Sequence, residues 1–179
     1  MQYRPKQIGD AEVRYALIQK GNRMLFVVGL NPSTADTEKP DPTMQSVMRI
    51  AEYNGYDGFV MINLYPKRAT APKDLPQACD PVLHRNNLEY IKKVLVELVP
   101  FDVRKGTSQE GDVDVWLAYG NNIDRRDYLL ECLRDIIKVF EPHHPRWYHI
   151  NSLTGKGHPR HPLYQKVGYL KNYQITESL

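Results

Sequence analysis

Short apolar runs, each followed by polar residues, recur along this chain. Four of them have the length of buried β-strands: Met24–Val28, Phe59–Ile62, Val113–Ala118 and Arg146–Asn151. A further run, Val13–Ile18, partly alternates apolar and polar positions. Turn-forming residues separate it from the first of the four strands, so we predict that these two segments form a β-hairpin.

Three segments show the spacing of apolar residues that is typical of amphipathic helices. The first follows Asp41 and Thr43, either of which could cap it, and ends at Asn54-Gly55. The second spans Val82–Val99, and the third spans Asp124–Phe140. Helices are therefore expected between the predicted strands.

Strands that alternate with helices predict a parallel sheet with right-handed crossovers. We therefore expect an α/β fold, a three-layer α/β/α sandwich with a central four-stranded parallel sheet plus an N-terminal antiparallel edge strand. A single domain over residues 1–179 would hold it. The proline-rich stretch Pro66–Pro81 cannot be regular for long, and Phe101–Asp112 is predicted to be a surface loop.

The composition is that of an ordinary globular protein, with 179 residues of which 41% are hydrophobic. The net charge of +3 and the pI of about 8.8 permit a polyanionic partner without requiring one. Cys79 and Cys132 fit neither a C-x-x-C motif nor a disulfide scaffold. Two reduced thiols in a cytosolic protein are the expectation.

The sequence indicates no targeting signal and no membrane partner. The first ten residues are mostly polar, and the longest strongly apolar stretch, Met24–Leu30, is far shorter than the ~20 residues that cross a bilayer. The expected location is the cytoplasm.

Each of the four central strands leads into a polar loop. These loops are Asn31–Asp36, Asn63–Arg68, Gly120–Asn122 and Thr154–Tyr164. Because the carboxyl ends of parallel strands line the binding crevice of an open sheet, the four loops predict a ligand site at one rim.

Two asparagines stand at strand ends within these loops. Asn31 could orient a water molecule or bind a ligand, or it could simply form a turn with Pro32. Asn63 interrupts an apolar run where a core side chain is expected. Its donor and acceptor could read a nucleobase or another amide-bearing ligand, or they could brace the loop.

The remaining polar residues of the first loop have two interpretations. Ser33, Thr34 and Asp36 could contact a ligand, or they could cap local backbone groups. Asp36 and Asp41 form too sparse a set of carboxylates to indicate magnesium, and solvated loop charge is the favoured interpretation. We expect neither a metal nor a cofactor.

His158 and His161 are candidates for stabilising negative charge. Each precedes a proline, which restricts the backbone to an extended shape and presents a stiff imidazole. An inert surface turn is the alternative for each, and the spacing does not match a zinc site. Arg68, Arg160 and the lysines of the same loops could attract phosphate, or they could be scattered surface charges.

Several of these motifs together resemble a family of uncharacterised, mainly bacterial proteins classed as a domain of unknown function. They are N-P-S-T-A-D at Asn31–Asp36, D-P-T at Asp41–Thr43, N-L at Asn63-Leu64, R-A-T at Arg68–Thr70 and H-P-R-H-P-L-Y at His158–Tyr164. The resemblance extends over roughly residues 24–164.

More distantly, the order of the motifs is similar to that of the uracil-DNA glycosylase superfamily. This resemblance implies that Asn31 positions a catalytic water and that Asn63 reads the base. It further implies that His158 or His161 stabilises the departing base, and that Gly120 belongs to the strand-end motif before the third helix. Further candidate substrate contacts are Pro32, Ser33, Thr34, Asp36, Tyr65, Arg68, Arg160 and Tyr164.

The expected function is binding of a nucleobase, nucleotide or nucleic acid such as DNA at the strand-end rim, with hydrolysis of an N-glycosidic bond as the candidate reaction. A non-catalytic nucleotide- or protein-binding module is the alternative. It is favoured by Ser33, where the superfamily has glycine, and by Met44–Ser46, where relatives carry basic residues. A third alternative is a hydrolase of small nucleosides. The sequence does not indicate an oligomeric state.

Overall fold

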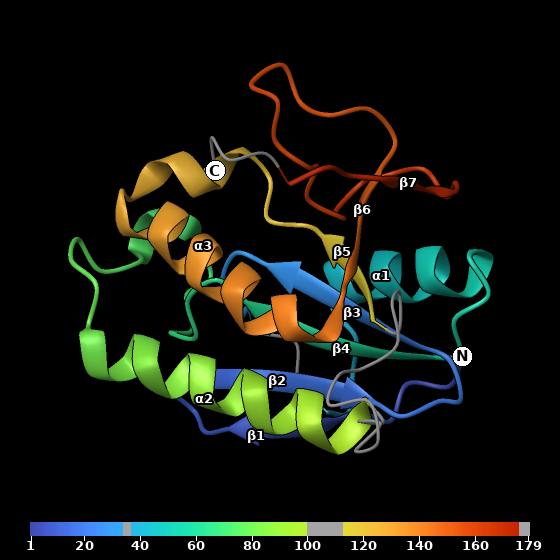
Figure 1. Cartoon of the computed structure of the whole chain (residues 1–179), viewed down its shortest axis with the longest axis horizontal. Coiled ribbons are helices and arrows are strands. Elements are labelled where there is room, and N and C mark those ends of the chain that lie inside the picture. The colour runs from blue at the N-terminus through green and yellow to red at the C-terminus, as the bar shows by residue number, and fades with distance from the viewer. Residues whose placement is uncertain (34–36, 100–112, 176–179) are drawn as a thin grey trace.

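The protein is built around one seven-stranded sheet. The computed structural model describes residues 1–33, 37–99 and 113–175, and in it the strands lie in the order β1-β2-β4-β3-β5-β6-β7 (Figure 1). The four central strands are parallel, which confirms that part of the prediction. They are β3 (Met24–Gly29), β4 (Gly58–Asn63), β5 (Asp114–Leu117) and β6 (Arg146–Ile150).

Three antiparallel strands extend the parallel core on both sides. On one side, β2 (Arg14–Gln19) pairs with β4, and β1 (Lys6–Gly9) pairs with the outer edge of β2. On the other side, β7 (Leu170–Asn172) pairs with β6. The sheet is therefore mixed, and the C-terminal segment, for which the sequence analysis predicts no element, supplies one of its edges.

The predicted hairpin between the first two runs is wrong. β2 lies beside β4 and not beside β3, and it is not an edge strand because β1 covers it. The connection between them crosses the start of β4: a Cβ on Gly21 would lie 2.5 Å from the backbone nitrogen of Gly58. Turn residues signal a reversal of the chain, but they do not tell whether the next strand pairs with its neighbour or passes over it.

Helices cover both faces of the sheet (Figure 1). One face carries α1 (Pro42–Tyr53), and the other carries α2 (Pro81–Leu98) and α3 (Tyr128–Phe140). The side chain of Asp41 caps α1 by accepting a hydrogen bond from the backbone N–H of Met44 at 2.8 Å. The predicted cap and the helical spacing are therefore confirmed for this helix.

The second helix agrees with its prediction to within one residue at each end. The third begins later than predicted, because Asn121–Arg125 forms a separate 3₁₀ turn, η2, before α3. Two more 3₁₀ turns are η1 (Pro72–Asp74) and η3 (Glu141–His143). The predicted loop Phe101–Asp112 lies outside the described residues.

The two faces of the sheet bury separate cores. Val47 and Ile50 of α1 pack against Leu25 and Val27 of β3 on one face. Phe26 and Val28 of the same strand point to the opposite face, where α2 and α3 cover them. This alternation explains why β3 is apolar throughout. Within the described ranges, no helix has both the length and the apolar character needed to cross a membrane.

Candidate ligand-binding site

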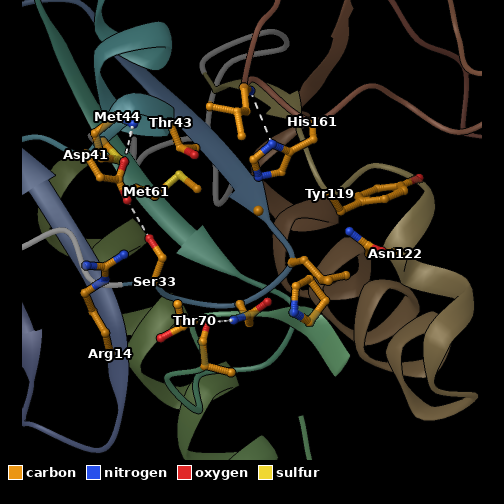
Figure 2. Close-up of a pocket in the computed structure, with 16 residues that line it drawn as sticks. Arg14, Ser33, Asp41, Thr43, Met44, Met61, Thr70, Tyr119, Asn122 and His161 are labelled. Carbon is orange, nitrogen blue, oxygen red and sulfur yellow. Dashed lines mark hydrogen bonds between the residues drawn. The ribbon is translucent and has the colours of Figure 1, made fainter. Parts of the chain in front are cut away.

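A pocket of about 260 Å³ opens at the carboxyl edge of the parallel strands, beside the start of α1 (Figure 2). The loops after β3 and after β6, far apart in the sequence, meet there, as the strand-end argument predicted. The pocket is small compared with the roughly 300–1,000 Å³ of drug-sized sites, and it would suit a single ring system. Its polar lining consists of Arg14, Asn31, Ser33, Asp41, Thr43, Thr70, Tyr119, Asn122 and His161.

Asn31 joins two of the strand-end loops. Its Nδ2 donates hydrogen bonds to the carbonyl oxygens of Ala69 at 2.8 Å and Pro32 at 3.1 Å. The amide nitrogen therefore braces the loop after β3 against the loop after β4, a role that neither interpretation of Asn31 included. No residue of the described ranges donates to Oδ1, so this oxygen is the part of Asn31 that could accept a hydrogen bond from a ligand or a water.

Ser33 and Asp41 form one wall of the pocket. Ser33 Oγ donates a hydrogen bond of 2.5 Å to Asp41 Oδ2, while the other oxygen of this carboxylate caps α1. Of the two predicted helix caps, Asp41 is the one that is used, and the Ser33 hydroxyl binds its carboxylate and not a backbone group. Thr34 and Asp36 lie outside the described residues. No cluster of metal-ligating side chains occurs in the part of the chain that the structure describes.

Arg14 is a lining residue that the sequence analysis missed. Its side chain is buried, and burial lowers the pKa of its guanidinium to about 10, with a smaller contribution from the nearby charge of Arg68. It still carries a positive charge at neutral pH. The feature of the sequence that could have indicated Arg14 is its position as a lone charged residue at the start of a mostly apolar strand. Only the antiparallel pairing of β2 with β4 shows that this residue reaches the rim.

His161 lines the pocket, and its hydrogen bonding fixes which ring nitrogen carries the proton. Its Nδ1 accepts a hydrogen bond from the backbone N–H of Leu163 at 3.2 Å, so the neutral ring carries its hydrogen on Nε2. Gly120 supports this loop: its N–H donates to Pro159 O, and with φ of 68° it leaves room for the His161 backbone. A Cβ there would lie 3.0 Å from His161 Cβ.

Burial lowers the pKa of His161 below its ordinary value of 6.5, although the charge of Asp41 partly opposes this. The unfolded chain therefore binds a proton more readily than the folded chain. Stability that is present above about pH 6.5 should be lost as the pH falls through this value toward the folded-state pKa. We expect His161→Gln to flatten the pH dependence of urea unfolding between about pH 7 and pH 5. His144→Asn is the control outside the pocket, and an unchanged decline in His161→Gln would contradict the expectation.

His158, in contrast, does not line the pocket. Its Nε2 pairs with Asp124 Oδ1 at 2.9 Å, which ties its loop to η2. Arg160 is also a brace, since its guanidinium donates to the carbonyl oxygens of Ser152 and Leu153. Tyr164 is 89% exposed and lies outside the lining. Of the residues predicted in this loop, the structure therefore brings only His161 to the pocket.

Three predicted contacts from the first two loops also lie outside the lining. Arg68 donates hydrogen bonds to Ser33 O and Gln7 Oε1, and so fixes the back of the pocket wall. Pro32 is buried, and its carbonyl accepts from the Asn31 side chain. Tyr65 belongs to the core on the α2–α3 face, where its ring lies against Tyr128. β4 ends before Tyr65, so strand alternation no longer predicts the side to which this residue points.

Two of the lysines that the sequence places in the strand-end loops form ion pairs with carboxylates, so the positive charge there is partly neutralised. Lys67 pairs with Glu12 at 2.5 Å, and Lys156 pairs with Asp124 at 2.7 Å. Such surface pairs contribute little to stability, but they reduce the net positive field that a long polyanion would meet.

Asn63 lies beneath the floor of the pocket. It is 1% exposed, and neither polar atom of its side chain has a hydrogen-bond partner among the described residues. Gly29, which lines the floor, pairs with Asn63 across the sheet. A Cβ on Gly29 would lie 2.8 Å from Asn63 Oδ1 and 2.5 Å from the terminal methyl of Met61. Met61 is among the residues that line the pocket, whereas Asn63 is not.

Fold and pocket together define an α/β protein with a polar pocket at the carboxyl edge of its parallel strands. The chain belongs to the family described as "Protein of unknown function (DUF1643)", whose model matches residues 14–163. Membership of an uncharacterised family, predicted from the motifs, is confirmed. The matched range begins and ends at two residues of the pocket lining, Arg14 and Leu163. No curated protein and no solved structure showed a significant match to the chain.

Proposed function

We propose that the pocket binds a nucleobase, free or as part of a nucleotide or nucleic acid. The observation that carries this proposal is Asn63, a buried amide next to the pocket floor whose donor and acceptor have no partner within the described part of the chain. A buried polar group without a partner costs about 1–3 kcal/mol, and a ligand can supply the missing partners. The lactam edge of a base offers one acceptor beside one donor, which matches the amide of Asn63.

Access to Asn63 requires Met61 to move. Its methyl group occupies the space above Gly29, and unbranched methionine can change rotamer at little cost. A flat ring entering over Gly29 would take the place of this methyl and reach Asn63 Oδ1. Gly29 suits this approach because it has no side chain of its own to block the floor.

The reaction that the lining supports best is hydrolysis of an N-glycosidic bond. Water would attack the sugar carbon, with Asn31 Oδ1 accepting one of its hydrogen bonds, while the bond to the base nitrogen breaks. The Nε2–H of His161 would donate a hydrogen bond to the base as it leaves with negative charge. The order of Asn31, Asn63 and His161 along the chain resembles that of the motifs in uracil-DNA glycosylases, and a three-layer α/β/α fold of that type is part of this proposal.

A non-catalytic binding module is the second candidate, and a specific observation favours it. The Asn31 amide donates hydrogen bonds to two backbone carbonyls, those of Pro32 and Ala69, which holds its side chain in a structural role. Binding without turnover would then be the whole function. The neutralised lysines favour a small ligand over a long nucleic acid under either candidate.

Binding and turnover assays on the purified protein separate the candidates. We expect uracil or another free base to bind in calorimetry, and His161→Ala and Asn63→Ala to weaken that binding about tenfold or more. DNA containing uracil, hypoxanthine or mismatches, together with free nucleosides, tests for glycosidic cleavage. Base binding with no cleavage supports the binding module, and cleavage of nucleosides alone indicates a nucleoside hydrolase. If no base, nucleoside or DNA binds and nothing is cleaved, the proposal is wrong.

A further inference from the structure

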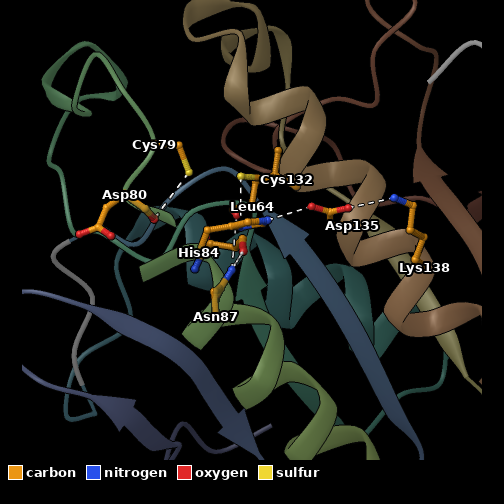
Figure 3. A network of polar contacts seen from close by, with 9 residues as sticks. Leu64, Cys79, Asp80, His84, Asn87, Cys132, Asp135 and Lys138 are labelled. Atoms are coloured by element: carbon orange, nitrogen blue, oxygen red, sulfur yellow. Dashed lines mark hydrogen bonds and ion pairs between the residues drawn. The ribbon is translucent and has the colours of Figure 1, made fainter. Parts of the chain in front are cut away.

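The two cysteines of the chain are far apart in the sequence but lie close together in the fold, on the α2–α3 side of the sheet (Figure 3). Cys132 is buried on α3, and Cys79 is half-buried in the segment just before α2. Their thiols interact with each other, and the pKa of each is affected by this contact. Neither residue takes part in the pocket described above.

A histidine and a carboxylate complete this cluster. His84 Nε2 lies 3.0 Å from Asp135 Oδ2, and His84 Nδ1 lies 3.4 Å from Cys132 Sγ. Because a carboxylate accepts hydrogen bonds, Nε2 carries the hydrogen of the neutral ring. Nδ1 is then left as an acceptor that faces the thiol. Asp135 therefore holds His84 in the tautomer that can take a proton from Cys132.

We propose that Cys79 and Cys132 form a redox-sensitive modification site, a dithiol that a hydroperoxide converts to a disulfide with His84 as the base. Metal binding does not explain the cluster, since the described residues contain no group that could hold an ion. The proposal is independent of the function assigned to the pocket.

The chemistry proceeds in two steps with hydrogen peroxide as the oxidant. Cys79, the more accessible thiol, attacks one peroxide oxygen and gives up its proton in the same step. The O–O bond breaks and the leaving hydroxide takes up that proton, so the products are a sulfenic acid and water. Cys132 then transfers its proton to His84 Nδ1 and attacks the sulfur of Cys79. The hydroxyl leaves with a proton as water. In sum, two thiols and one peroxide give one disulfide and two waters.

Burial raises the pKa of both thiols, so both are protonated at neutral pH. A neighbouring base is therefore needed for Cys132 to become a nucleophile at a useful rate. The product would tie the segment before α2 to α3. This same segment carries Ala69, Thr70 and Pro72, which line the pocket. Closing a long loop of chain in this way should stabilise the fold.

The test is to treat the whole protein with hydrogen peroxide and to count free thiols. We expect the two thiols to disappear together and non-reducing peptide mapping to find a Cys79–Cys132 link. We also expect a reductant to restore both thiols and the oxidised form to melt several degrees higher. The chain has only these two cysteines, so any disulfide within one molecule must join Cys79 to Cys132. Oxidation to separate sulfinic acids without a link would overturn the proposal.

The role of His84 is tested by trapping the intermediate. In His84→Gln, closure of the disulfide should slow by about tenfold or more, and dimedone should label the accumulated sulfenic acid on Cys79. His144→Asn, a change at an η3-flanking turn, is the matched control and should close at the parent rate. Equal closure rates in His84→Gln and the parent, with no added dimedone labelling, would remove His84 from the proposal.

Discussion

Asn63→Val should raise the free energy of unfolding by about 1–3 kcal/mol and abolish binding of any base that the parent binds. The fold buries the amide of Asn63, and no residue of the described ranges pairs with either of its polar atoms, whereas the unfolded chain leaves the amide hydrated. Valine removes this penalty and suits the end of a buried strand. The same change removes the group that would read the base. Urea unfolding and calorimetry with uracil measure the two effects separately.

Asn87→Leu is the matched control, because Asn87 is the other fully buried asparagine in the described part of the chain. Its Nδ2 donates to the carbonyl oxygens of Asn63 at 3.0 Å and Leu64 at 3.4 Å, so it links α2 to the end of β4. Its loss should destabilise the fold by about 2 kcal/mol. The two substitutions should therefore shift stability in opposite directions. If Asn63→Val destabilises as much as Asn87→Leu, then Asn63 has a structural partner and the argument for the base site fails.

Asp114→Ala should lower the free energy of unfolding by about 3 kcal/mol and leave the pocket intact. Asp114 is 6% exposed and accepts hydrogen bonds of 2.7 Å from both the hydroxyl of Tyr56 and Nε of Arg146. Burial and the neighbouring carboxylate raise the pKa of Tyr56, so its hydroxyl remains a donor. Alanine would leave this buried hydroxyl without an acceptor. Arg146 is about half exposed, so its charge can regain water.

Urea unfolding measures the loss of stability in Asp114→Ala, and two further variants give reference values for it in the same assay. Tyr56→Phe removes one donor and keeps the pair with Arg146, so we expect it to cost about 1 kcal/mol. Glu97→Ala breaks an exposed ion pair with Lys20 and should change stability by less than about 0.5 kcal/mol. Because β5 begins at Asp114 and runs toward the pocket edge, ligand binding should be unaffected in all three variants. A loss for Asp114→Ala no larger than that for Glu97→Ala would show that the buried network contributes little.

Asn63 and Asp114 are both buried polar residues in strands, but the local sequence pattern indicates a special role only for Asn63. Asn63 ends an apolar run, and this position was enough to predict a site residue or a loop brace. Asp114 stands between two valines in a predicted strand, and nothing local to it indicates a tyrosine and an arginine from distant elements. The pairing depends on where α1 ends and on the register of β5 against β6. Such partners follow from packing and are not encoded in a local pattern.

The candidate site shows the same division. Strand-end position was enough to predict that the loops carrying Asn31 and His161 would meet, because parallel strands end at one edge of a sheet. His158 and His161 have the same local setting, each before a proline. Only the folded loop shows that one pairs with Asp124 while the other faces the pocket. Arg14 reaches the rim only because β2 runs antiparallel to β4.

The sequence by itself determined the four parallel strands, the three helices and the family, because these depend on local periodicity, helix capping and short motifs. The tertiary structure decided which strand lies beside which, which of the polar loop residues point inward, and where the two cysteines meet. The physical reason is the range of the interactions involved. Apolar spacing acts over one or two turns of chain, whereas strand order and side-chain contacts depend on segments that are distant in the sequence.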